Sequence, residues 1–292
     1  MSRVLLIGND INNINNSKSW EDLLHRIVKI CGNNFDIDIN KAKPFPLLYE
    51  EIYLKAIRSG IIDEKTLKSK IAEIICNIEP NEIHKELISI NCDNYITTNY
   101  DYSLEKVLVN GDLRKELSNI GIRKESKYSL YRHNRIGNKK FWHIHGEVNI
   151  PNSITLGFEH YGGQLQQYRD YTITGTHYKG AFKNRQPLHQ QLTKGNTFEN
   201  SWINFLYQNE VHILGLKLGY EETDLWWLLA SRARFIHESS FLNKSKIIYY
   251  CPSVYKDPYK TEIMEACNIK TVFLDFEGLD FYKNVIKKIN KG

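Results

Sequence analysis

The chain has 292 residues, enough for one large α/β domain or two small ones. Hydrophobic residues make up 41% of the chain and charged residues 25%, which is ordinary for a globular protein. The 39 basic and 34 acidic residues give a net charge of +5. This mildly basic charge permits the binding of anionic ligands but does not by itself indicate a nucleic-acid-binding protein. The five cysteines form no C-x-x-C pair, and no apolar run reaches the length of a signal peptide or a membrane span. We therefore expect a cytoplasmic protein with no disulfide framework, no cysteine zinc site and no membrane contact.

Apolar runs that predict strands alternate with segments of helical periodicity along the chain. Val4 to Ile7 predicts a buried parallel strand, and the acidic turn after Ser19 predicts a helix from Trp20 to about Cys31. Further strands are predicted at 90–96, 141–145, 154–156, 211–214, 247–250 and 271–274, and further helices at 47–76 with a break near Gly60, 81–88, 102–110, 202–207, 224–235, 261–267 and 281–289. This order predicts one α/β domain over 1–292, with a Rossmann-like, doubly wound, mostly parallel sheet and helices on both faces.

Three segments interrupt this alternation. Residues 33–80 predict a helical and loop insertion, and Gly137-Asn138 predicts a hairpin turn inside the basic stretch 123–140. Residues 171–198 contain no acid and predict a mobile, basic insertion. The two basic segments are either solvated faces or contacts for nucleic acid or an anionic partner subunit.

The first candidate site is the turn Thr97-Thr98-Asn99-Tyr100-Asp101, between a predicted strand and a predicted helix. In an open α/β sheet, small ligands bind at the edge where strands lead into helices. An amide and a carboxylate two residues apart are well placed there to hold a polar ligand. The structural alternative is that Asn99 adopts a left-handed turn and Asp101 caps the next helix.

The second candidate site is the stretch from Phe141 to Gly146. Strand alternation predicts that His143 and His145 share one face. His145 ends the predicted strand at the ligand edge, and a neutral imidazole suits proton transfer near pH 7. The H-x-H pair also has the spacing of metal ligands, but we expect no metal here.

Two glycine turns follow other predicted strands. Gly8-Asn9-Asp10 follows the first strand, where a glycine lets the backbone approach a phosphate, although a dinucleotide fingerprint has three glycines. Gly215-Leu216-Lys217-Leu218-Gly219 follows the strand at 211–214 and offers another place for a ribose or phosphate. The alternative for each is a tight turn of an ordinary α/β fold.

Together these turns resemble the sirtuin (silent information regulator) superfamily, in particular its bacterial sirtuin-like branch linked to antiphage defence. The resemblance runs from Arg3 to about Leu274. The chain departs from the family in lacking the C-x-x-C pairs of the zinc ribbon found in deacetylase sirtuins. The motifs that carry the resemblance are Thr97-Thr98-Asn99-Tyr100-Asp101, similar to T-Q-N-x-D; His145-Gly146, similar to the catalytic H-G pair; Gly8-Asn9-Asp10-Ile11-Asn12, similar to G-A-G-x-S; and Gly215-Leu216-Lys217-Leu218, similar to G-T/F-S-L.

The resemblance implies that NAD+ is the substrate and that its nicotinamide–ribose bond is cleaved to nicotinamide and ADP-ribose. It implies three catalytic residues. Asn99 would orient the ribose and the attacking water, and His145 would contact or deprotonate a ribose hydroxyl or that water. Asp101 would hold the nicotinamide side of the pocket or stabilise cationic charge. The NAD-binding residues that it implies are Gly8, Asn9, Asp10, Asn12, Thr97, Thr98, Gly215, Leu216 and Lys217.

The same resemblance implies an oligomeric NAD+ hydrolase that acts as an abortive-infection effector in antiphage defence. Two alternatives stay open. One is a weakly active subunit of a complex with an ATPase/translocase or nuclease partner, with the apolar Trp226-Trp227 helix as part of the assembly surface. The other is an ADP-ribosyltransferase, in which a nucleophile other than water attacks.

Overall fold

The computed structural model describes residues 2–15, 20–32, 37–39, 43–60, 62–120, 127–175, 186–196, 201–239 and 245–291. Within these residues, eight strands form one sheet in the order β3-β4-β5-β2-β1-β6-β7-β8. Neighbouring strands are parallel except in the pairs β3–β4 and β4–β5, so the predicted α/β class with a mostly parallel sheet is confirmed. The strands are β1 (Arg3–Ile7), β2 (Asn94–Thr97), β3 (Ser118–Ile120), β4 (His133–Ile136), β5 (Lys139–His143), β6 (Glu210–Leu214), β7 (Lys246–Pro252) and β8 (Ile269–Leu274).

The central strand β1 pairs with β2 on one side and β6 on the other. Its apolar sequence follows from this position, because a central parallel strand is buried on both faces. Val4 and Leu6 point into one core cluster, and Leu5 and Ile7 point into a second cluster on the other face. Both faces of the sheet are therefore covered.

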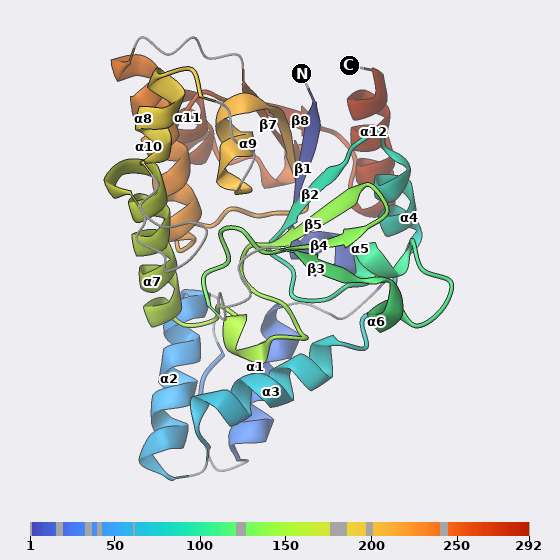
Figure 1. Cartoon of the computed structure of the whole chain (residues 1–292). Helices are drawn as coiled ribbons and strands as arrows, with labels where there is room; N and C mark the ends of the chain where they lie inside the picture. Colours follow the sequence, from blue (N-terminus) through green and yellow to red (C-terminus); the bar gives the residue numbers. More distant parts are fainter. Residues whose placement is uncertain are drawn as a thin grey trace.

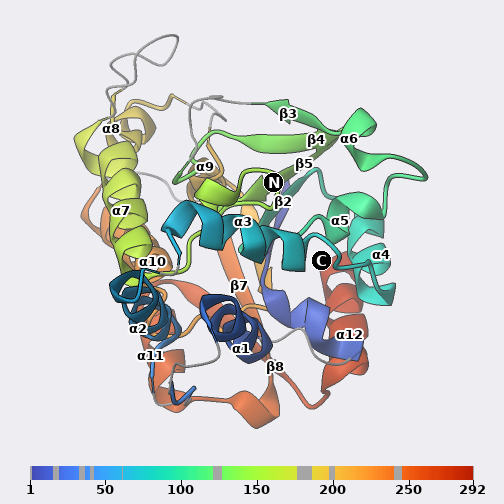
Figure 2. The same cartoon turned by 90° about the horizontal axis from the view of Figure 1, so that it is seen from below.

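Helices α7 to α11 cover one face, and α4, α5 and α12 cover the other, as Figure 1 shows. Helices α1, α2 and α3 enclose a third core cluster, which lies across the end of the sheet (Figure 2). No described helix is long and apolar enough to cross a membrane. The helices are α1 (Trp20–Cys31), α2 (Phe45–Arg58), α3 (Glu64–Ile75), α4 (Glu82–Ser89), α5 (Ser103–Lys106), α6 (Leu113–Glu116), α7 (Phe158–Arg169), α8 (Leu188–Thr193), α9 (Ile203–Gln208), α10 (Thr223–Glu238), α11 (Pro258–Ala266) and α12 (Gly278–Lys291).

Several predicted elements differ from the structure. The helix predicted over 102–110 is only the short α5, because i→i+3 hydrogen bonds tighten the chain after Lys106. Residues 154–156 form no strand in the described sheet, since Thr155 N–H donates instead to the His145 carbonyl (2.8 Å). The segment that follows β1 and contains the Gly8-Asn9-Asp10 turn continues as a 3₁₀ helix, η1 (Asn9–Asn15). The hairpin turn at Gly137-Asn138 is confirmed between β4 and β5.

The basic stretch 123–140 is not a uniformly solvated face. Arg132 is buried, and its Nε lies 2.6 Å from Glu147 Oε1. Lys139 donates to the Cys92 carbonyl (2.9 Å), while Arg135 is exposed. The structure places α8 and a π-helical turn, Asp170–Thr174, in the predicted basic insertion. Ser19 and, within the two basic segments, residues 123–126, 176–185 and 197–198 lie outside the described residues.

Candidate functional site

The turn after β2 is fixed by the hydroxyl of Thr97. This hydroxyl donates to the Ile7 carbonyl (3.0 Å) and accepts the Asn99 N–H (3.0 Å), while the Thr98 N–H donates to the same carbonyl (3.1 Å). Because Ile7 ends β1, these bonds hold the Asn99 turn against the carboxyl ends of two neighbouring parallel strands. The predicted position of this turn at the carboxyl edge of the parallel strands is confirmed.

The side-chain amide of Asn99 is buried without a partner. The residue is 3% exposed, and neither Oδ1 nor Nδ2 has a hydrogen bond within the described part of the chain. Leaving such a group unsatisfied costs about 1–3 kcal/mol, so buried amides nearly always bind a protein group, a water or a ligand. The amide is therefore a preformed place for a polar ligand atom.

Asp101 has both carboxylate oxygens engaged. Oδ1 accepts the Ser103 N–H (2.9 Å) at the start of α5, and Oδ2 accepts Asn12 Nδ2 (3.0 Å). Asn12 Oδ1 in turn lies 3.1 Å from His84 Nε2. Burial lowers the pKa of His84 to about 4, so this ring is neutral at pH 7 and Nε2 donates to the amide oxygen. Asp101 thus joins the Asn99 turn to η1.

The two histidines of the H-x-H pair point to different surroundings, so the prediction that they share a face was wrong. Strand β5 ends at His143, and the chain turns before His145. His143 Nδ1 lies 2.8 Å from the Asn99 carbonyl, and Nε2 lies 2.7 Å from Glu105 Oε1. Burial favours a lower pKa, but the Glu105 carboxylate outweighs it and raises the pKa of His143 to about 9. His143 is therefore charged at pH 7 and lies behind the Asn99 turn.

A buried network of charged and polar groups continues from His143. Glu147 accepts hydrogen bonds from Tyr102 Oη (2.7 Å) and Asn134 Nδ2 (3.0 Å), in addition to its ion pair with Arg132. Asn134 Nδ2 also reaches Glu105 Oε1 (3.2 Å). We call this set, with His143 and Glu105, the buried polar network.

His145 forms an ion pair or hydrogen bond with an acid that is far away in the sequence. Its Nε2 lies 3.1 Å from Oδ2 of Asp224, at the start of α10, and both side chains are buried. The ring also meets Tyr161 of α7 edge-on, with 5.4 Å between ring centroids. Gly146 has φ +100°, and a Cβ there would lie 2.2 Å from the Ser153 carbonyl oxygen, so the backbone itself requires the glycine of the H-G pair.

A second acid lies near the start of α10. The carboxyl oxygen Oε2 of Glu222 is buried and has no partner among the described residues. Burial, followed by the charge of Asp224, raises the pKa of Glu222 to about 8. This carboxyl group is mostly protonated at pH 7, so it can donate as well as accept a hydrogen bond.

The two predicted glycine turns pack directly against each other. Gly8 N–H donates to the Leu214 carbonyl (3.0 Å), and Asp10 N–H donates to the Gly215 carbonyl (2.9 Å). A Cβ on Gly8 would lie 2.4 Å from the Gly215 oxygen. Gly8 thus brings the loops after β1 and β6 together, and Asp10 Oδ2 accepts Tyr282 Oη (2.7 Å) on the other side.

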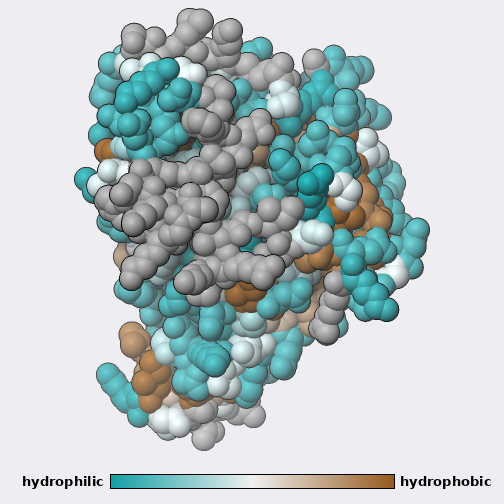
Figure 3. Space-filling model, viewed as in Figure 1, coloured by the Kyte–Doolittle hydropathy of each residue, from teal (hydrophilic) through white to brown (hydrophobic). Residues whose placement is uncertain are grey.

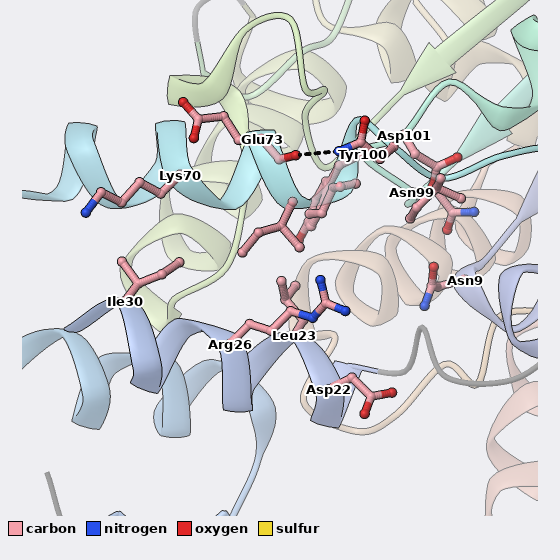
Figure 4. A pocket seen from close by; sticks show the side chains of 14 residues that line it. Asn9, Asp22, Leu23, Arg26, Ile30, Lys70, Glu73, Asn99, Tyr100 and Asp101 are labelled. Atoms are coloured by element: carbon pink, nitrogen blue, oxygen red, sulfur yellow. Dashed lines mark hydrogen bonds between the residues drawn. The ribbon is translucent and has the colours of Figure 1, made fainter. Parts of the chain in front are cut away.

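Three cavities surround these turns. The first, the α1–α3 cavity, has a volume of about 690 Å³ and lies between α1 and α3, with Asn99 and Asp101 at one end. Figure 4 shows Arg26 of α1 and Lys70 of α3 on its walls and Asn9 near the Asn99 turn. Volumes of this order are typical of small-molecule sites.

The second cavity, the His145 cavity, has a volume of about 590 Å³ and is lined by His145, Tyr161, Glu222 and the Gly215 turn. The third, the Tyr282 cavity, has a volume of about 560 Å³ and lies between the Gly215 turn, the end of β7 and the start of α12. These two cavities share five lining residues: Asp10, Asn13, Gly215, Leu216 and Lys217. The α1–α3 cavity shares Asn9 with the His145 cavity. The three form a row along the loops at the ends of β1, β2 and β6.

The predicted site residues divide among these cavities. Asn99 and Asp101 line the α1–α3 cavity, whereas Thr98 and His145 line the His145 cavity. Asn9 borders both of these cavities, and Asp10, Gly215, Leu216 and Lys217 line the His145 and Tyr282 cavities. Gly8, Asn12 and Thr97 line none of the three, because their polar or backbone groups bind other parts of the fold.

A family comparison fits this arrangement. The model of the SIR2-like domain matches residues 93–250, which is more than half of the chain. The chain belongs to the SIR2-like domain family. The SIR2-like family includes enzymes that use NAD. The match contains the Asn99 turn, His145 and the Gly215 turn, while the Gly8 turn precedes it. No curated protein matches the chain.

Sequence reasoning missed three residues that surround His145 in this SIR2-like site. Asp224 was noted only as the start of a helix, and its partner His145 is 79 positions away. Tyr161 lies on α7, a helix that the sequence did not predict, and Glu222 carried no motif. The one available signal was an acid that follows the Gly215 turn and starts a helix at the ligand edge. Among the described residues, no three His, Cys, Asp or Glu side chains gather as a metal site.

Proposed function

We propose that this SIR2-like protein hydrolyses NAD+ to nicotinamide and ADP-ribose. The single observation that carries the proposal is the buried, unpartnered amide of Asn99 at the ligand edge, near the cavity of the His145–Asp224 pair. A buried amide without a protein partner is suited to a polar ligand atom, and a histidine with an acidic partner is suited to proton transfer.

We place the dinucleotide along the His145 and Tyr282 cavities, which join at the Gly215 turn. The backbone of Gly215 and the side chain of Lys217 would approach the pyrophosphate, because a glycine turn and a cation suit an anionic group there. From the opposite loop, Asn9 would contact the ribose or phosphate, and Asp10 would accept a hydrogen bond from a ribose hydroxyl. The nicotinamide ribose would then reach the Asn99 turn.

Cleavage of the nicotinamide–ribose bond releases nicotinamide as a neutral pyridine and leaves an oxocarbenium-like ribosyl group. Water adds to this carbon and loses one proton, which gives ADP-ribose. Asn99 would orient the ribose and the water by hydrogen bonds. His145 would accept the proton, and the negative charge of Asp101 would favour the cationic transition state.

The test is incubation of the purified chain with NAD+ and chromatography of the products. We expect nicotinamide and ADP-ribose from the wild-type protein and neither product from Asn99→Ala or His145→Ala. The matched controls are Asn284→Ala on α12 and His237→Ala on α10, which truncate the same residue types outside the three cavities; Asn284 is half-buried and His237 is exposed. Turnover like that of the wild type in Asn99→Ala or His145→Ala would overturn the proposed function, provided that circular dichroism shows folded protein.

The α1–α3 cavity favours ADP-ribosyl transfer as a second candidate. It borders Asn99 and Asp101 but not His145, and it has room for an acceptor molecule of its own. Methanol is a simple probe, because attack by methanol gives a methyl ADP-ribose that chromatography separates from ADP-ribose. A fraction of methyl ADP-ribose among the products that exceeds the mole fraction of methanol in the solvent would favour transfer. ADP-ribose as the sole product would favour hydrolysis.

In a cell, we propose that NAD+ depletion makes the chain an abortive-infection effector in antiphage defence, as a homo-oligomer or with an ATPase/translocase or nuclease subunit. Trp226 and Trp227 are half-buried against the core, which leaves little of them for assembly. Large exposed apolar side chains lie instead on α2, at Leu47, Leu54 and Ile57. Figure 3 shows a hydrophobic area at the lower left of the molecule, where Figure 1 draws α2. Nucleic-acid contact through the exposed part of the basic segments is proposed as well, and its test is oligonucleotide affinity at two salt concentrations.

A further inference from the structure

The contact between His145 and Asp224 determines which ring nitrogen carries the proton. Asp224 Oδ2 lies 3.1 Å from His145 Nε2, and the Asp224 side chain is fully buried. An ionised carboxylate can only accept hydrogen bonds, so Nε2 must be the donor. A neutral imidazole has one N–H, which leaves the lone pair on Nδ1.

The other ring nitrogen is open to the cavity. His145 has no described hydrogen bond through Nδ1, and Nδ1 is not one of the buried atoms that lack a partner. This nitrogen is therefore reached by solvent, and the residue lines the His145 cavity beside the Gly215 turn. The lone pair is available to a group bound in that cavity.

We propose that Asp224 is a positioning residue for His145. It keeps Nε2 protonated and leaves the Nδ1 lone pair in the cavity, where Nδ1 takes the proton of the attacking water or of a ribose hydroxyl. The proposal rests on the proposed function for the identity of the substrate, while the orientation of the ring does not depend on it.

The surroundings of the pair place one negative charge beside the ring. Glu222 is mostly neutral at pH 7, because burial and the charge of Asp224 raise its pKa to about 8. Tyr161 packs on the ring as a neutral phenol, and burial raises the pKa of Tyr100 far above 10 as well. The charge that stabilises an imidazolium at His145 is therefore that of Asp224.

More distant charged groups enter the same cavity from other elements. They are Asp10 after β1, Glu21 on α1, Lys43 before α2, Lys217 in the Gly215 turn and Glu221 before α10. None of them has a described hydrogen bond to His145. Lys43 pairs with Glu51 at 2.8 Å. These groups change the local potential, but they do not fix the tautomer of the ring.

Asp224→Asn tests the proposal, because it keeps the size of the side chain and removes the charge. In ¹⁵N NMR of histidine-labelled protein, with the His145 signals assigned from His145→Gln, we expect protonated Nε2 and unprotonated Nδ1 in the wild type. We expect Asp224→Asn to populate the Nδ1–H tautomer. For NAD+ cleavage, kcat/KM should fall roughly 100-fold, and the acid limb of its pH profile should move to lower pH, since His145 loses its anionic partner.

Two further variants keep the test decisive. Asp224→Glu retains the carboxylate and should retain the wild-type tautomer, and Asp280→Asn removes an exposed acid from α12 and should change neither readout. An unchanged tautomer together with an unchanged acid limb in Asp224→Asn would overturn the proposal, even if the rate fell. If the wild type leaves NAD+ intact while the tautomer depends on Asp224, the positioning role stands and the proposed function fails.

Discussion

Asn99→Ala is expected to stabilise the ligand-free protein while it removes activity. Both polar atoms of the Asn99 side chain are buried without a partner in the described structure. Each unsatisfied group costs about 1–3 kcal/mol, and truncation removes both costs. Lost packing offsets part of this gain, although the residue already borders the α1–α3 cavity, so little new enclosed space forms. We expect a net gain of about 1 kcal/mol.

For a domain of this size, about 1 kcal/mol corresponds to a rise of roughly 2–4 °C in Tm. The assay is thermal unfolding by circular dichroism with and without NAD+, with Asn284→Ala as the control. We expect NAD+ to raise the Tm of the wild type and to have no effect on Asn99→Ala. A Tm for ligand-free Asn99→Ala equal to or below that of the wild type would show that Asn99 is satisfied in solution, and the argument for a preformed ligand contact would fail.

Two further predictions concern stability. His143 has a folded pKa of about 9 against 6.5 for the ordinary side chain, so its contribution, up to about 3 kcal/mol, is fully present below pH 6.5 and is lost as the pH rises through 9. Urea unfolding at pH 6.5 and 9.5 should therefore show a smaller difference for His143→Gln than for the wild type; an equal difference would contradict the assigned charge. Gly8→Ala places a methyl group 2.4 Å from the Gly215 oxygen and should lower the free energy of unfolding by about 1–3 kcal/mol. Gly111→Ala, which meets nothing within 4 Å, is the control, and equal unfolding free energies for the two variants would contradict the close packing of the loops.

The order of strands and helices was predictable because central parallel strands are apolar on both faces. Val4 to Ile7 illustrates this, since its two faces enter two different core clusters. Helix α7 was missed because it contains Gly162 and Gly163 and few apolar residues. Tertiary contacts compensate there, as Gly163 packs against the Tyr128 ring and α7 packs against α10. Such contacts leave no periodic pattern in the sequence.

The candidate site was predictable only one turn at a time. Asn99 and His145 could each be placed at the ligand edge, because a residue that follows a parallel strand lies there whatever its neighbours are. The pairing of His145 with Asp224 depends on how α10 docks on the sheet, which local patterns do not determine. The different surroundings of His143 and His145 depend on where β5 ends, and strand ends are the least certain part of a sequence prediction.

The buried polar network behind the Asn99 turn constrains how this site can change during evolution. Loss of Arg132 alone would remove the ion pair of Glu147 and leave its buried charge to His143 and two hydrogen bonds, at a cost of up to about 3–5 kcal/mol. Replacement of both residues by apolar side chains of similar volume would cost far less. Substitutions in this network should therefore be strongly epistatic, and among related chains its members are expected to be exchanged in pairs rather than singly. His143 contacts the Asn99 carbonyl, so paired exchanges in the network would preserve the position of Asn99, whereas single exchanges would disturb it.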